Sequence, residues 1–366
     1  MRFPLRDVSR IGKEQVDMYA EGNLSIMNGN RPICRPIRPI PEEPMNFATE
    51  YLLLAARKYY GKIRKIEDAD IRLPQGTEYF ESSGQDASDF IKGKLLASGP
   101  FMAARLGAVE LNCLLTYHSI RQDAPGWDKC IRFIRHEIHP FWWSKKVRKS
   151  MANNAGFFPV SESALSRFCD RMLSDLRQLD VLGSWLRGES VFREYFPNAL
   201  KIPLWDLEPY HHLAPWSEAL KDRAVLVIHP FEETIQKQYG KRGHLHRDAR
   251  VLPAFELKTL KAVQSIAGNE VPFSNWFEAL DFMSERVENT RFDVALIGCG
   301  AYGFPLAAFV KRLGKQAIHL GGALQLLFGI RGKRWDQLNR YNEHWVRPAP
   351  EETPATFSNV EEGCYW

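Results

Sequence analysis

Short apolar runs alternate with amphipathic segments along most of the chain. The clearest runs cover residues 224–228, 294–297 and 317–320, and each is bounded by polar or glycine residues. Uninterrupted apolar runs of this length are typical of strands buried on both faces. Residues 164–187 instead repeat their apolar side chains at helical spacing and indicate one core-facing helix or a pair. The alternation predicts an α/β protein with a Rossmann-like, mostly parallel sheet and helices on both faces.

The two ends of the chain lack this alternation. Residues 31–41 place proline at short intervals, which favours an extended arm, and residues 46–62 form a helix candidate. Tyrosines and lysines flank that helix, so it would rest on a membrane interface or pack on its own domain. We expect an N-terminal arm with a proline-rich linker and one helix over 1–70, a Rossmann-like domain over 71–345, and a surface tail over 346–366.

Composition narrows the class of protein. Of the 366 residues, 45% are hydrophobic and 25% charged, which is typical of a globular protein. No apolar run is long enough to cross a bilayer, and the N-terminal residues lack the apolar segment of a secretory signal. Six scattered cysteines without a C-x-x-C pair indicate reduced thiols. We therefore expect a cytoplasmic protein. The expected location includes a peripheral position at the inner face of a membrane.

A glycine motif follows one predicted strand. Gly298, Gly300 and Gly303 fit G-x-G-x-x-G, with Tyr302 inside the motif, directly after the strand 294–297 and at the start of a helix. Glycines allow a tight turn and let an anionic group approach the free N–H donors of the helix. The next strand ends without an acidic residue, which disfavours NAD and favours general phosphate or nucleotide binding. Tight packing alone is the alternative explanation.

Two further strand ends carry polar side chains. Arg105 ends one predicted strand, Gly107 makes the turn, and Glu110 lies in the first turn of the next helix. Arginine would hold a phosphate, whereas Glu110 would bind a divalent metal, act as a base, or only complement the helix dipole. His229 follows another strand and Glu233 opens the helix after it. His229 is a proton carrier or a structural histidine.

Several common catalytic motifs are absent from the sequence. His136 and His139 stand three residues apart and do not form H-E-x-x-H. Neither G-x-S-x-G nor G-x-x-x-x-G-K-[ST] occurs. These absences argue against metalloproteases of that type, the usual serine hydrolases and P-loop enzymes. The net charge of +5 suits anionic ligands, an acidic membrane face or nucleic acid, so charge alone does not decide among them.

Five stretches together carry a resemblance to a known family: residues 105–111, 155–159, 225–231, 293–303 and 319–322. In this order they resemble the GT-D-type glycosyltransferases, specifically their bacterial relatives, over about residues 80–340. The resemblance implies a Rossmann-like transferase that uses a nucleotide-sugar, often with Mn²⁺ or Mg²⁺. It implies a role in surface or capsular polysaccharide or glycoconjugate assembly. The expected partners are the nucleotide-sugar donor and a saccharide or glycoconjugate acceptor, with no nucleic acid.

The resemblance also implies roles for individual residues. Glu110 would contact the metal or the sugar, and His229 or Glu233 would activate the acceptor hydroxyl. Typical members carry an aspartate where this chain has Ala108, so a metal-free transferase that uses Arg105 is an alternative. A non-catalytic nucleotide-binding protein is a second alternative, and a nucleotide-cofactor oxidoreductase or methyltransferase is a third. The residues expected to bind the nucleotide-sugar are Arg105, Gly107, Gly298, Gly300, Tyr302, Gly303 and Gly322.

Overall fold

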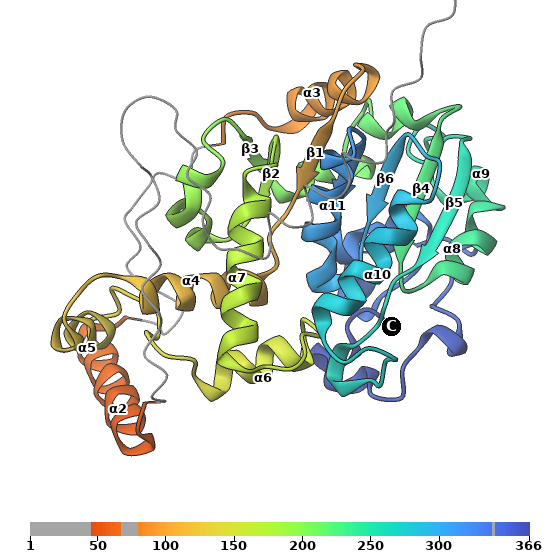
Figure 1. Ribbon diagram of the computed structural model, residues 1–366. Helices are drawn as coiled ribbons and strands as arrows, with labels where there is room; N and C mark the ends of the chain where they lie inside the picture. Colours follow the sequence, from red (N-terminus) through yellow and green to blue (C-terminus); the bar gives the residue numbers. More distant parts are fainter. Residues whose placement is uncertain (1–44, 67–79, 339–340) are drawn as a thin grey trace, which may run out of the picture. The chain divides into compact units, whose positions relative to one another are not determined.

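The computed structural model describes residues 45–66, 80–338 and 341–366 (Figure 1). The proline-rich arm expected from the sequence lies outside these ranges. The described residues belong to one compact unit, Glu43–Trp366. This unit includes both the helix and the C-terminal residues that the sequence pattern had set apart from the central domain.

Seven parallel strands form a single sheet in the order β3-β2-β1-β7-β6-β4-β5. Every residue of β1, β6 and β7 is buried, which explains the continuous apolar sequence of β1 and β6. The structure thus confirms the predicted α/β fold with a parallel sheet. The strands are β1 (Phe101–Ala104), β2 (Val181–Ser184), β3 (Leu200–Pro203), β4 (Ala224–His229), β5 (Glu256–Lys261), β6 (Val294–Ile297) and β7 (Gln316–His319).

Helices cover both faces of the sheet. On one face α11 packs on β6, β7 and β1, with α7 and α10 on either side of it (Figure 1). On the other face α3 packs on β1, and α8 packs on β4 and β5. The α-helices are α2 (Phe47–Arg64), α3 (Gly84–Leu96), α4 (Ala108–Arg121), α5 (Gly126–Ile134), α6 (Lys145–Asn153), α7 (Glu162–Leu176), α8 (Glu232–Tyr239), α9 (Arg242–Leu245), α10 (Trp276–Glu288), α11 (Gly303–Arg312) and α12 (Leu324–Leu327).

One sequence prediction needs correction. Residues 164–187 were expected to form a helix or a helix pair, but α7 ends at Leu176 and the chain then forms β2. Leu179, Leu182 and Trp185 continue the helical spacing of α7 by coincidence. Such a short apolar run satisfies a helical and an extended pattern equally well, and pairing with β1 and β3 decides between them.

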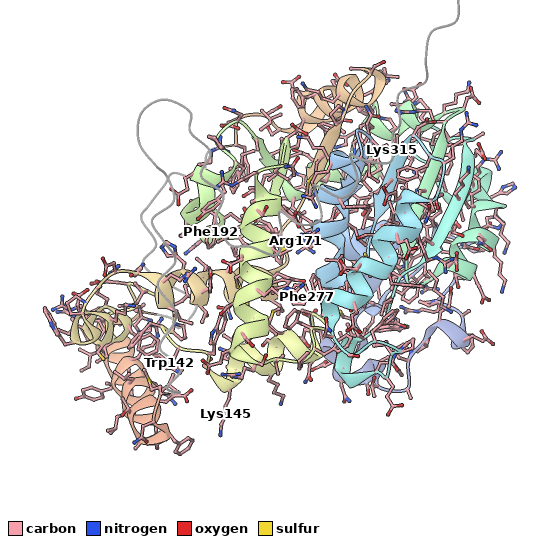
Figure 2. All side chains as sticks on the ribbon, in the orientation of Figure 1. Trp142, Lys145, Arg171, Phe192, Phe277 and Lys315 are labelled. Carbon is pink, nitrogen blue, oxygen red and sulfur yellow. The ribbon has the colours of Figure 1, made fainter. Side chains whose placement is uncertain are left out.

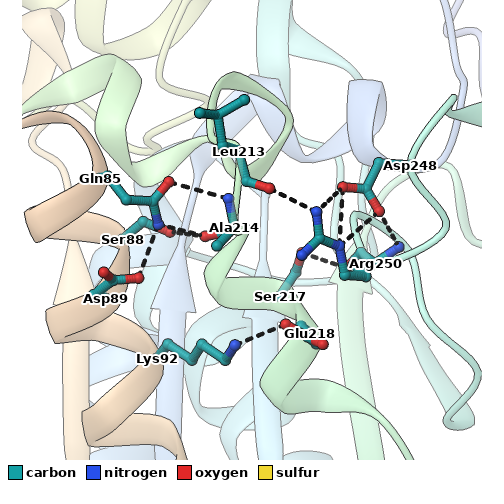
Figure 3. Close-up of polar contacts among 10 residues, drawn as sticks. All are labelled: Gln85, Ser88, Asp89, Lys92, Leu213, Ala214, Ser217, Glu218, Asp248 and Arg250. Atoms are coloured by element: carbon teal, nitrogen blue, oxygen red, sulfur yellow. Dashed lines mark hydrogen bonds and ion pairs between the residues drawn. The ribbon is translucent and has the colours of Figure 1, made fainter.

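Polar contacts hold α3 to a segment far along the chain (Figure 3). The Gln85 amide donates to the carbonyl oxygen of Ala214 at 2.8 Å and accepts from its N–H at 3.0 Å. Lys92 pairs with Glu218 at 2.7 Å. These contacts hold α3 on its face of the sheet.

The strand connections reverse direction between β4 and β6. The chain leaves β4 toward β5 on one side, whereas it leaves β6 toward β7 on the other side. The loops after two adjacent strands therefore separate at their carboxyl ends and leave a crevice there. In open parallel sheets this reversal point is where ligands bind.

The C-terminal segment, residues 347–366, folds onto the rest of the unit. Val360 and Cys364 are buried, and the buried carboxylate of Glu352 accepts hydrogen bonds from the N–H groups of Glu233 and Thr234 at the start of α8. This carboxylate supplies the acceptor that the first turn of a helix lacks. Among the described residues no helix is long and apolar enough to cross a membrane.

Candidate functional site

A cavity opens at the carboxyl ends of the strands. Its walls come from residues at or after the ends of β1, β2, β4, β5, β6 and β7, together with the C-terminal segment. His229 at the end of β4 and Gly298 after β6 both line it, so the cavity lies at the reversal point. Most strand ends singled out in the sequence therefore meet in one place.

The glycine loop, residues 298–303, forms one wall. A Cβ atom on Gly298 would lie 2.5 Å from the carbonyl oxygen of Gly321 and 2.9 Å from Cδ2 of His229, so only glycine lets these three chain segments approach. Gly300 has a positive φ of 57°, and a Cβ there would meet nothing closer than the Ala155 carbonyl oxygen at 3.9 Å. Gly298 serves close packing, whereas Gly300 presents open backbone to the cavity.

His319, the last residue of β7, lies behind the glycine loop and lines the same cavity. A Cβ atom on Gly303 would lie 2.3 Å from its Nε2. The ring is buried at the end of the strand. Burial, followed by the charge of Arg105, lowers the pKa of His319 to about 3, so the ring is neutral near pH 7. The sequence analysis did not select His319, although its place at a strand end was a usable signal.

Arg105 and Glu110 face the cavity from the loop after β1. The Arg105 guanidinium lies over the Trp185 ring, 4.9 Å from its centroid. The Glu110 carboxylate folds back over Gly107, where a Cβ atom would lie 1.8 Å from Oε2. Desolvation raises the pKa of Glu110, while the charge of Arg105 acts in the opposite direction. Gly107 is therefore needed for the carboxylate to rest at the start of α4.

The C-terminal part of the chain supplies groups that the sequence analysis missed. Arg334 forms an ion pair with Glu361 and lies 4.9 Å from the centroid of the Tyr365 ring. Tyr365 packs against Gly322, since a Cβ atom there would come within 2.4 Å of the ring, and Trp366 completes this wall. These residues belong to no recognisable motif. Only the fold brings them beside Arg105.

His229 lines the cavity in a defined protonation state. It is buried, and its Nδ1 accepts a hydrogen bond from the N–H of Phe231 at 3.0 Å. Burial lowers its pKa to about 3, so the ring is neutral and carries its proton on Nε2. A ring in this state donates a hydrogen bond and cannot accept a proton from a substrate at Nε2.

Glu233 and Tyr302 were also expected in the site. Glu233 is exposed at the start of α8 and does not line the cavity. Tyr302 does line it, but its hydroxyl is bonded to Ser265 at 2.9 Å and its ring stacks on Trp276. Tyr302 therefore fixes the glycine loop to its neighbours.

The acidic groups of the cavity do not fit a resident Mn²⁺ or Mg²⁺. Glu361 is close enough to Glu110 to raise its pKa, but Glu361 is paired with Arg334. Nowhere in the described ranges do three or more histidine, cysteine, aspartate or glutamate side chains gather to hold a metal ion. Hard divalent cations require several oxygen ligands. Two arginines, Arg105 and Arg334, line this cavity beside Glu110 and Glu361.

Comparison with known proteins adds little beyond this geometry. No family model matches the sequence, and no curated protein matches it. A solved structure titled "Selenomethionine substituted structure of domain of unknown function 1792 (DUF1792)" matches 82% of this chain and 96% of that chain, with 13% identity and a TM-score of 0.39. The fold assignment rests on the order and direction of the strands themselves.

Proposed function

We propose that this protein is a nucleotide-sugar-dependent glycosyltransferase that acts in surface or capsular polysaccharide or glycoconjugate assembly. The observation that carries the proposal is the convergence of the glycine loop, Arg105 and Glu110 on one cavity at the reversal point of the sheet. This cavity combines an open backbone turn, a fixed cation and a carboxylate of raised pKa. The family resemblance of the sequence supplies the reaction class.

The donor diphosphate would lie between the glycine loop and the arginines. Gly300 lines the cavity, and the nearest atom to the position of a Cβ there is the Ala155 carbonyl oxygen at 3.9 Å, so a phosphate would lie against this open turn. Arg105 and Arg334 line the same cavity and would neutralise the charge of the leaving diphosphate. His229 would donate a further hydrogen bond from Nε2. This arrangement needs no divalent metal.

We assign Glu110 as the base in the transfer step. The acceptor oxygen bonds to the anomeric carbon of the donor sugar, and the bond from that carbon to the diphosphate oxygen breaks. The nucleoside diphosphate leaves with the electron pair of that bond, and the acceptor hydroxyl proton passes to Glu110. Desolvation raises the pKa of Glu110 and strengthens it as a base. His229, whose Nδ1 already accepts a hydrogen bond, is assigned to binding.

Aromatic rings would hold the rest of the donor. Trp185 and Tyr365 carry Arg105 and Arg334 on their faces, and Trp366 adjoins them in the cavity wall. Ring faces of this kind stack on nucleobases without strong base preference. The C-terminal segment would thus form the nucleoside side of the site.

Product formation tests the proposal. Purified protein is incubated with a panel of nucleotide-sugars and saccharide acceptors, with Mn²⁺ or with EDTA, and the nucleoside diphosphate released and the product mass are measured. We expect transfer from one donor class that EDTA does not abolish. The variant Glu110→Gln should lose it, whereas the control Glu285→Gln, exposed on α10, should keep it. Full activity of Glu110→Gln would refute the assignment of the base.

One observation favours a second candidate, a nucleotide-binding protein without catalysis. Ala108 stands where family members carry the aspartate of their acidic pair. A nucleotide that binds in the cavity without turnover of any donor would support this candidate over the transferase. NAD and S-adenosylmethionine belong in the same panel, because binding of either would favour an oxidoreductase or a methyltransferase.

We also propose a cytoplasmic location with peripheral contact to the inner face of a membrane, and no nucleic-acid partner. The exposed aromatic side chains of α2 support the membrane contact.

A further inference from the structure

Helix α2 packs against the rest of the unit along one narrow face. Leu53, Arg57 and Gly61, which are four residues apart, are its buried residues. The Arg57 guanidinium donates to the carbonyl oxygens of Phe133 and Ile138 and lies over the Phe133 ring at 4.5 Å. Because an arginine in these contacts cannot rotate freely, the face that α2 presents outward is also fixed.

The outward face of α2 is apolar to an unusual degree. Phe47, Tyr51, Leu52, Tyr59 and Ile63 are each 60–70% exposed. Of the fifteen large hydrophobic side chains exposed in the described part of the chain, six lie on this one helix of 18 residues and two more on α5, which packs against it. Single exposed apolar residues are ordinary, whereas such a concentration marks an interaction surface.

Cations surround this apolar face. Lys58 and Lys62 are exposed on the same helix, and Arg64 and Lys65 are exposed at its end. Lys145, at the start of α6 (Figure 2), places its ammonium group 5.0 Å from the centroid of the Phe47 ring. The only acidic residue on the helix is Glu50.

We propose that the exposed face of α2 binds the surface of a membrane that contains anionic lipid. Aromatic and aliphatic side chains would enter the boundary between headgroups and acyl chains, and the lysines would pair with lipid phosphates. A second copy of this chain fits less well, because a two-fold contact would bring lysines against lysines. This inference does not depend on the proposed transferase activity.

Vesicle sedimentation with the full chain tests the proposal. The probes are vesicles of phosphatidylcholine alone and of phosphatidylcholine with phosphatidylglycerol, at low and high salt. We expect binding to the anionic vesicles that weakens as salt rises. Each of Lys58→Gln, Lys62→Gln and Lys145→Gln should weaken it roughly fivefold, whereas Lys221→Gln and Lys237→Gln, exposed elsewhere, should not.

An apolar variant separates insertion from charge attraction. The combined change Leu52→Ser, Tyr59→Ser and Ile63→Ser should reduce vesicle binding at least about tenfold. The matched control changes Leu96 and Leu213, exposed apolar residues outside α2, to serine. All five positions are exposed, so unchanged thermal unfolding midpoints would exclude misfolding.

Two results would overturn the proposal. One is the absence of binding to anionic vesicles, or equal binding by the α2 variant and its control. The other is a dimer, measured by sedimentation velocity, that the apolar variant abolishes while vesicles remain unbound. That second result would assign the face to self-association.

Discussion

The ring of His319 lies directly against Gly303, the first residue of α11. No side chain fits between them, because a Cβ atom on Gly303 would be 2.3 Å from Nε2 of the ring. The third glycine of the motif therefore makes room for a buried histidine on the neighbouring strand. This contact sets how closely the start of α11 approaches the end of β7.

The variant Gly303→Ala should destabilise the protein. The added methyl group must displace the buried ring of His319, and overpacking of this kind costs roughly 1–3 kcal/mol in the free energy of unfolding. Urea denaturation monitored by circular dichroism measures the change. The control is Gly93→Ala in α3, where a Cβ would meet nothing within 4 Å. That substitution should stabilise the protein by about 0.5–1 kcal/mol. Equal effects of the two changes would contradict the packing described.

The second prediction concerns the anchor of the C-terminal segment. Glu352→Ala removes the acceptor for the first N–H groups of α8 and for the Thr234 hydroxyl. Leaving these buried donors unpaired should lower the free energy of unfolding by about 1–3 kcal/mol. The neighbouring Glu351 is exposed, so Glu351→Ala is a matched control with little expected effect. If both variants unfold like the unmodified protein, the segment is not anchored as described.

Stability should fall as the pH is lowered below about 6.5, the pKa of an unfolded histidine. Burial lowers the pKa of both His229 and His319 to about 3. Between these values the unfolded state binds more protons than the folded state, so stability present above pH 6.5 is lost as pH falls toward 3. Each ring contributes a slope of up to about 1.4 kcal/mol per pH unit.

Urea unfolding at pH values from 7 to 5 measures this slope. The variants His229→Gln and His319→Gln should each make the dependence shallower, whereas His244→Gln, exposed on α9, is the control. Glu110 acts in the opposite direction, because its raised pKa favours proton uptake by the folded state. An unchanged slope in both buried variants would show that the rings are not buried as neutral groups.

Local sequence pattern predicted much of the sheet. The runs at 224–228, 294–297 and 317–320 correspond to β4, β6 and β7, because strands buried on both faces consist mostly of apolar residues. Strand β2 was missed, since its four residues continue the helical spacing of α7. Only pairing with neighbouring strands identifies such a short strand, and pairing is not visible in a local pattern.

The cavity was predictable where it depends on strand ends. Arg105, Glu110, His229 and the glycine loop all follow strands, and parallel strands bring their carboxyl ends to one edge. Arg334, Glu361 and Tyr365 follow no strand and belong to no motif, so their position depends on the path of the C-terminal segment. Glu233 was expected in the site because it follows β4 closely, yet it is exposed at the start of α8.

The most direct test of the central claim is calorimetric titration of uridine, guanosine, cytidine, adenosine and thymidine diphosphates into the protein and into Arg105→Gln. The guanidinium of Arg105 lines the cavity and would donate a hydrogen bond to the diphosphate. A hydrogen bond to a charged group contributes about 1.5–3 kcal/mol, so its loss corresponds to a roughly 10- to 100-fold loss of affinity. The account predicts that one of these nucleotides binds, that Arg105→Gln weakens its binding by this factor, and that the exposed control Arg291→Gln does not. Failure of all five nucleotides to bind, or equal binding by Arg105→Gln and its control, would contradict it.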